Sequence, residues 1–217
     1  MRSLGAVIDL VLPSRCAGCA EPGGAWCPRC AASLGPPAAV SRPSLPPTYA
    51  LAAYAGAPRR AVLAYKERSR RELAAHLARP TAAAVRLIGR HPRAGPLVLV
   101  PAPSRPAAAR RRGGQHMAAV AQRCAGYLRG SGLPAGVSRA LRLDARALDS
   151  VGLTPSDRAA NLARHLHPVP ARLPPPSATV ILLDDVITTG ATAAACVAVL
   201  AASGVGVSAV LAITATT

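Results

Sequence analysis

The residues best suited to chemistry lie in the segment VILLDDVITTGAT, residues 180–192. An apolar run is followed there by two adjacent acids, Asp184 and Asp185, and then by a turn built from threonines and a glycine. Two carboxylates repel each other, so their closeness requires a shared partner such as a vicinal diol or a metal ion. Hydroxyl groups and the N–H groups at the start of a following helix suit a phosphate. The segment therefore predicts a site for a ribose that carries a 5-phosphate. The alternative is an acidic strand-to-helix turn with threonine caps, which accounts for one acid and one threonine but not for all six polar and glycine positions.

The elements that must position this segment alternate between strand and helix. Strands are expected over 49–56, 96–103, 136–141, 178–183 and 207–213, and helices over 58–90, 114–129 and 191–203. The helix over 58–90 is expected to break near Pro80, and an arginine-rich turn is expected to follow the second strand. This order predicts an α/β fold with a doubly wound, mostly parallel sheet. In such sheets ligands bind beyond the carboxyl ends of the strands, which is where the two acids are expected.

The composition sets limits on the core and on the partners. The chain has 217 residues, of which 51% are hydrophobic, and it contains no phenylalanine, so aliphatic residues must fill its core. A net charge of +17 favours polyanionic partners, although Lys66 is the only lysine and the excess of arginine has the look of a general compositional bias. Aromatic residues that would stack on single-stranded nucleic acid are nearly absent.

Four cysteines lie close together near the start of the chain as two CxxC pairs, Cys16 with Cys19 and Cys27 with Cys30. Two such turns together provide the four thiolates of a closed, structural zinc site. Two disulfides are the alternative, but nothing in the sequence indicates secretion. We expect a zinc-ribbon module over 1–35, a proline-rich linker over 36–48 and one α/β domain over 49–217. The opening residues are expected to form a short amphipathic helix, and no segment is apolar over a length that would span a membrane, so a cytoplasmic location is expected.

The segment 180–192 closely resembles the phosphoribosyl-pyrophosphate (PRPP) motif of type I phosphoribosyltransferases. Three further segments resemble the ComF (ComFC-like, late-competence) family within that superfamily: AVLAYKERSRRELA at 61–74, VPAPSRPAAARRRGG at 100–114 and DSVGLTPSDRAANL at 149–162. Members of this family often carry an N-terminal zinc ribbon. The chain departs from the family at Ser150, where glutamine is usual, and over Arg112–His116, where the family has RGFNQ.

The resemblance implies a type I phosphoribosyltransferase fold, Mg²⁺-dependent transfer of phosphoribose from PRPP to an unidentified acceptor, and a link to natural transformation. Asp184 and Asp185 would hold the ribose hydroxyls. The 5-phosphate would be wrapped by Thr188, Thr189, Gly190, Ala191 and Thr192. Arg110 and Arg112 are candidates for the diphosphate, each with a solvated basic loop as its alternative. Lys66 is a candidate for the diphosphate or the transition state, with a solvated lysine at a helix end as its alternative.

Residues 142–160 are expected to form a hood over the site. His116, His165 and His167 have no motif around them and are expected at the surface. Three functions stay open at this point: an active phosphoribosyltransferase, a PRPP-sensing protein without transfer chemistry, and a competence accessory protein that binds single-stranded DNA or a helicase. The oligomeric state, monomer or homo-oligomer, is open as well.

Overall fold

The computed structural model describes residues 15–89, 95–145, 161–162 and 164–216. The amphipathic helix expected at the start of the chain lies outside these residues. So does most of the expected hood, because residues 146–160 are not described.

A six-stranded sheet forms the centre of the molecule, in the order β1-β2-β8-β7-β3-β4. Only β1 runs antiparallel to its neighbour, and the other five strands are parallel. Their bounds are β1 Ala38–Ala39, β2 Thr48–Ala53, β3 Leu97–Pro101, β4 Ala135–Val137, β7 Thr179–Ile187 and β8 Val207–Ala215. The expected α/β fold with a mostly parallel sheet is thus confirmed.

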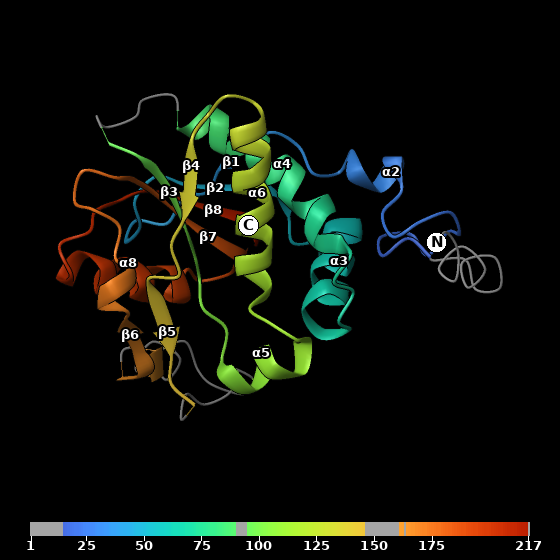
Figure 1. Cartoon of the computed structure of the whole chain (residues 1–217). Coiled ribbons are helices and arrows are strands. Elements are labelled where there is room, and N and C mark those ends of the chain that lie inside the picture. Colours follow the sequence, from blue (N-terminus) through green and yellow to red (C-terminus); the bar gives the residue numbers. More distant parts are fainter. Residues whose placement is uncertain (1–14, 90–94, 146–160, 163, 217) are drawn as a thin grey trace, which may run out of the picture.

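Helices cover both faces of this sheet, as Figure 1 shows. One face carries α3 (Gly56–Glu67), α4 (Leu73–Ile88) and α6 (His116–Gly130). The other carries α8 (Ala191–Ala202) and a small antiparallel hairpin of β5 (Leu141–Leu143) and β6 (Leu166–Pro168). The strands have the period of two that this layering requires, since Ile181 and Leu183 pack on the first face and Val180 and Leu182 on the second.

The connections of the sheet reverse direction between β3 and β7. From β3 the chain passes through α5 (Pro106–Arg112) and α6 to β4 on one side, whereas from β7 it passes through α8 to β8 on the other. The loops after β3 and β7 therefore leave in opposite directions from neighbouring strands. The carboxyl ends of two such strands border the crevice in which doubly wound sheets bind their ligands.

Two expectations about the helices are wrong. The predicted helix over 58–90 breaks at residues 68–72, where Ser69 has a φ of +53°, and not near Pro80. Pro80 lies inside α4 instead. The expected arginine-rich turn is in fact the short helix α5, which has Pro106 in its first turn and ends at Gly113 with a φ of +69°.

The segment before β2 contacts the rest of the fold at α3 and at β2. In the N-terminal module, Arg15 and Pro22 form an isolated bridge, and α2 (Pro28–Ala31) contains Cys30, the fourth cysteine of the cluster. The module lies beside α3 (Figure 1), where Arg60 donates a hydrogen bond to the carbonyl of Gly18. Further along, β1 pairs with β2.

None of the helices within the described residues has the length and apolar character needed to cross a membrane.

Candidate functional site

The two acids lie inside a strand, not after it. We expected the strand to stop at residue 183, but β7 continues to Ile187 because it pairs with β8 to its end. On the other side, pairing with β3 stops at Leu183, where the N–H of Ala102 bonds to the Leu183 carbonyl at 2.8 Å. Asp184 and Asp185 thus extend past the end of β3, at the reversal of the sheet.

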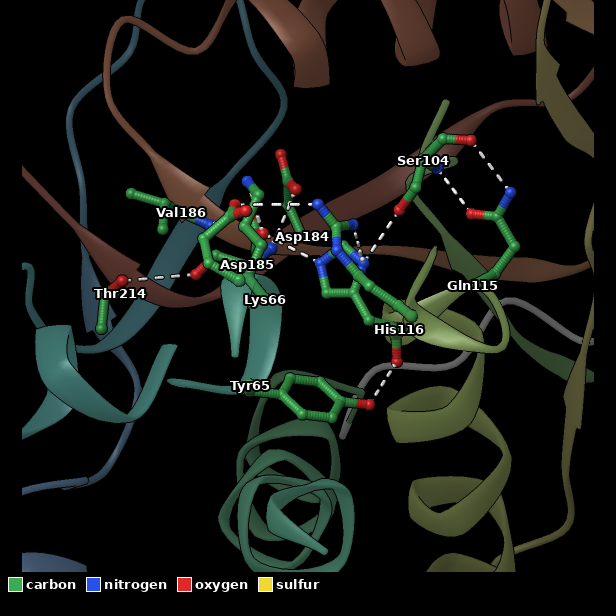
Figure 2. A network of polar contacts seen from close by, with 11 residues as sticks. Tyr65, Lys66, Ser104, Gln115, His116, Asp184, Asp185, Val186 and Thr214 are labelled. Carbon is green, nitrogen blue, oxygen red and sulfur yellow. Dashed lines mark hydrogen bonds and ion pairs between the residues drawn. The ribbon is translucent and has the colours of Figure 1, made fainter. Parts of the chain in front are cut away.

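Asp185 is the centre of a polar network that gathers side chains from three separate elements (Figure 2). Its Oδ2 atom lies 2.8 Å from Nζ of Lys66, at the end of α3, and 2.9 Å from Nε2 of His116, at the start of α6. Its Oδ1 atom accepts a hydrogen bond from the N–H of Val186 at 2.8 Å. A single buried carboxylate therefore holds one ammonium group and one imidazole N–H.

His116 is fixed from both sides of its ring. Its Nδ1 atom lies 2.8 Å from Oγ of Ser104 and 3.4 Å from Nη1 of Arg112. Its backbone carbonyl accepts a hydrogen bond from the hydroxyl of Tyr65 at 2.7 Å. With the proton on Nε2, the ring donates to Asp185 and its Nδ1 accepts from Ser104, so the neutral tautomer suits these contacts.

Ser104 is positioned in turn by Gln115. The Gln115 amide oxygen accepts from the Ser104 N–H at 2.6 Å, and its amide nitrogen donates to the Ser104 carbonyl at 2.9 Å. The loop after β3 is thereby clamped to the start of α6. Figure 2 shows the resulting chain of contacts, which runs from Gln115 through Ser104 and His116 to Asp185.

The two neighbouring acids have opposite ionisation. Burial and the charge of Asp185 raise the pKa of Asp184 from 3.8 to about 8. Burial also acts to raise the pKa of Asp185, but the contacts with His116 and Lys66 outweigh it and hold that pKa well below its usual value. Burial acts to lower the pKa of Lys66, and the attraction of Asp185 outweighs it, so the net shift is upward. Near neutral pH the pair therefore carries one proton and one charge, which relieves the repulsion between adjacent carboxylates.

The threonine loop lies directly after the acids. Gly190 takes the left-handed conformation, with a φ of +84°, and begins α8. Thr188 and Thr189 are exposed, and the Thr189 hydroxyl accepts from the N–H of Ala191 at 3.4 Å. Thr192 and Ala191 are half-buried in the first turn of the helix. The loop thus presents hydroxyl groups beside a helix N-terminus.

Arg42, in the proline-rich segment, supports this loop from a distant part of the chain. Its Nε and Nη2 atoms donate to the Thr188 carbonyl at 3.1 and 2.8 Å, and Nη2 also donates to the Thr216 carbonyl at 2.8 Å. A Cβ atom on Gly190 would lie 3.2 Å from Leu45 of the same segment. Residues 36–48 therefore pack against the loop.

Several of the predicted site residues come together in the structure. Lys66 contacts Asp185, and Arg112 approaches both His116 and Glu67, the latter at 3.7 Å. Arg110 is exposed and contacts none of these groups.

Sequence reasoning missed other members of the site. His116 was expected at the surface, which is wrong, because only 9% of it is exposed. The sequence signal for a role of His116 is its position directly after Gln115, in the segment that departs from the family pattern. Ser104 and Tyr65 lie in segments that resemble the family, but nothing in those segments singles them out, and nothing around Arg42 marks that residue.

The four cysteines near the start of the chain form a second site. The sulfur atoms of Cys16, Cys19, Cys27 and Cys30 lie within 4.8 Å of one another. The N–H groups of Gly18 and Cys27 each donate to Cys16 Sγ at 3.4 Å. Burial acts to raise the pKa of the Cys16 thiol, but hydrogen bonds from these N–H groups and from that of Cys19 outweigh it and lower the pKa from 9.0 to about 6. Four converging thiol groups of this kind are able to hold a metal ion such as zinc.

Comparison with known protein families finds none that matches the chain, and comparison with curated proteins finds no significant match.

Proposed function

We propose that the protein binds PRPP at the carboxyl edge of its sheet and transfers the phosphoribosyl group to an acceptor. The observation that carries this proposal is the position of Asp184 and Asp185, which are buried, extend past the end of β3 and precede a threonine loop at a helix N-terminus. The resemblance of residues 180–192 to the PRPP motif supports the same ligand.

The split ionisation of the two acids suits a ribose diol. Ionised Asp185 accepts hydrogen bonds from hydroxyl groups, while protonated Asp184 is able both to donate and to accept one. The 5-phosphate would then reach the threonine loop, where hydroxyl groups and the helix N-terminus favour an anion. One end of the ligand is read by acids and the other by hydroxyl and N–H groups.

The basic side chains of Lys66 and Arg112, which come from elements other than the threonine loop, suit the diphosphate. Lys66 and Arg112 come from α3 and α5, and both belong to the network around Asp185. Arg112 has 13% of its side chain exposed, so its charge is poorly screened by water. A guanidinium group there is able to bind diphosphate oxygens in bidentate fashion.

The site residues also fit Mg²⁺. Ionised Asp185 would provide a carboxylate oxygen, the kind of donor this ion prefers. Bound between ligand and protein, Mg²⁺ would neutralise charge on the departing diphosphate. In the transfer, the bond from the anomeric carbon to the diphosphate oxygen breaks, its electron pair leaves with pyrophosphate, and the acceptor nucleophile forms the new bond to carbon.

Calorimetric titration of PRPP with Mg²⁺ into the zinc-loaded full chain tests the proposal. We expect saturable binding that is lost in the double variant Asp184→Asn/Asp185→Asn. The matched control is Glu72→Gln, which removes an exposed carboxylate outside the site. Ribose 5-phosphate should bind more weakly than PRPP, because it lacks the diphosphate.

The next measurement separates an enzyme from a sensor. Pyrophosphate release with an added acceptor establishes transfer, whereas binding without release for any acceptor class assigns a PRPP-sensing role. No binding to the intact protein would overturn the proposal. DNA binding with a steep salt dependence would then become the account to pursue.

A further inference from the structure

A basic cavity lies on the β4 side of the loop that follows β3. Its volume is about 480 Å³, within the range of small-molecule sites. We call it the arginine cavity. Its apolar lining includes Pro103, Leu141 and Leu143. Its charged lining consists of three arginines and one carboxylate: Arg139, Arg142, Arg172 and Asp144.

The charges of the arginine cavity are only partly balanced. Arg142 pairs with Asp144 at 3.0 Å, and the same carboxylate is also 3.0 Å from Nε2 of His167. Within the part of the chain that the structure describes, Arg139 and Arg172 have no carboxylate within ion-pair distance. Two exposed arginines therefore line the cavity without a counter-ion from these residues.

The arginine cavity adjoins the Asp185 network. Gln115 lines the cavity and also holds Ser104, which contacts His116, the partner of Asp185. Pro101, another lining residue, is the last residue of β3 and pairs with Leu183, next to the acids. Cavity and acids therefore share one edge of the sheet, with the loop after β3 between them.

We propose that the arginine cavity binds the acceptor, and that this acceptor is a small organic anion with a carboxylate or phosphate on an apolar body. Arg139 and Arg172 bind the anionic group, since guanidinium groups recognise such anions in bidentate fashion. The proline and leucine side chains contact the apolar body. The assignment of this anion as the acceptor rests on the proposed transferase function, whereas the anion site itself does not.

An isosteric pair of ligands tests the charge requirement. Naphthalene-2-carboxylate and its neutral carboxamide have nearly the same shape, and each is titrated into the zinc-loaded full chain. We expect the carboxylate to bind at least about tenfold more tightly, which corresponds to about 1.4 kcal/mol. In Arg139→Gln/Arg172→Gln the preference should fall below about twofold, while the carboxamide, which depends on the apolar lining, binds as before.

The control variant Arg79→Gln/Arg123→Gln loses the same charge at exposed positions outside the cavity and should keep the preference. Equal binding of both ligands to the wild type, or an equal loss of preference in the control variant, overturns the anion site. Asp184→Asn/Asp185→Asn should bind naphthalene-2-carboxylate like the wild type. If PRPP fails to bind but the preference persists, the transferase proposal fails and the anion site stands.

Discussion

Replacing Asp184 with asparagine should stabilise the protein, and the gain should grow with pH. In the folded protein this carboxyl holds its proton, because burial and Asp185 raise its pKa from 3.8 to about 8. In the unfolded chain it ionises at its usual pKa. Asparagine has nearly the same shape as the protonated acid and has no proton to lose, so it keeps the folded arrangement without the penalty.

The sign and size follow from proton linkage. Between about pH 4 and pH 8 the folded state binds one proton that the unfolded state releases, so wild-type stability falls as pH rises in this window. The slope is at most about 1.4 kcal/mol per pH unit. From about pH 5 to about pH 7.5 the advantage of Asp184→Asn should therefore grow by about 3 kcal/mol.

Urea unfolding followed by far-ultraviolet circular dichroism, at both pH values and with zinc present, measures this difference. Zinc-site protonation affects wild type and variant alike, so it cancels in the comparison. The control is Glu72→Gln, which removes an exposed carboxylate whose partner is Arg70. Because an arginine does not titrate in this window, its effect should be the same at both pH values. A variant no more stable than wild type at the higher pH, or a difference independent of pH, would refute the ionisation state assigned to Asp184.

Three further predictions concern the supports of the site. Lys66→Met leaves Asp185 without its ammonium partner, so the free energy of unfolding should fall by about 1 kcal/mol. PRPP affinity should fall at least about tenfold. An unchanged urea midpoint would contradict the first expectation. Arg42→Gln removes hydrogen bonds to the carbonyls of Thr188 and Thr216. PRPP affinity should fall about tenfold while circular dichroism is unchanged, and hydrogen exchange in the threonine loop should accelerate; equal exchange rates would argue against the support. The chain should bind one zinc ion, measured by elemental analysis, and chelation should lower its melting temperature; Cys124→Ala should keep the metal, and a metal-free chain with the same melting temperature would contradict a structural role.

The central strands β3 and β7 were readable from sequence because their signals are local, whereas β1 was not expected and only part of the strand expected over 136–141 forms β4. Residues 97–101 and 179–183 form apolar runs bounded by proline, glycine or acids, and such runs identify buried strands. The extension of β7 to Ile187 was not readable, because it depends on pairing with β8, a partner distant in sequence. The helix break predicted near Pro80 failed for a related reason, because packing of α4 in the core outweighs the local preference of one residue.

The acids and the threonine loop of the site were predictable because they occupy thirteen consecutive residues. His116 and Arg42 were not, since each reaches the site from a separate element and carries no local pattern, and the family-like segment around Ser104 does not single that residue out. Their roles appear only when the sheet brings the loop after β3, the start of α6 and residues 36–48 to one edge. Contacts between distant segments are the part of a site that a single sequence encodes least visibly.

The support of the threonine loop by Arg42 also has a kinetic consequence. The contacts of Arg42 span 146 residues to Thr188 and 174 residues to Thr216. Contacts of such long sequence separation close large loops, so they form slowly and late in folding. They also require β8, which is synthesised after the other strands of the sheet. Because the part of β7 that holds the acids also pairs with β8, a nascent chain would place both the acids and the threonine loop only after β8 has joined the sheet, and we expect ligand binding to appear no earlier than that.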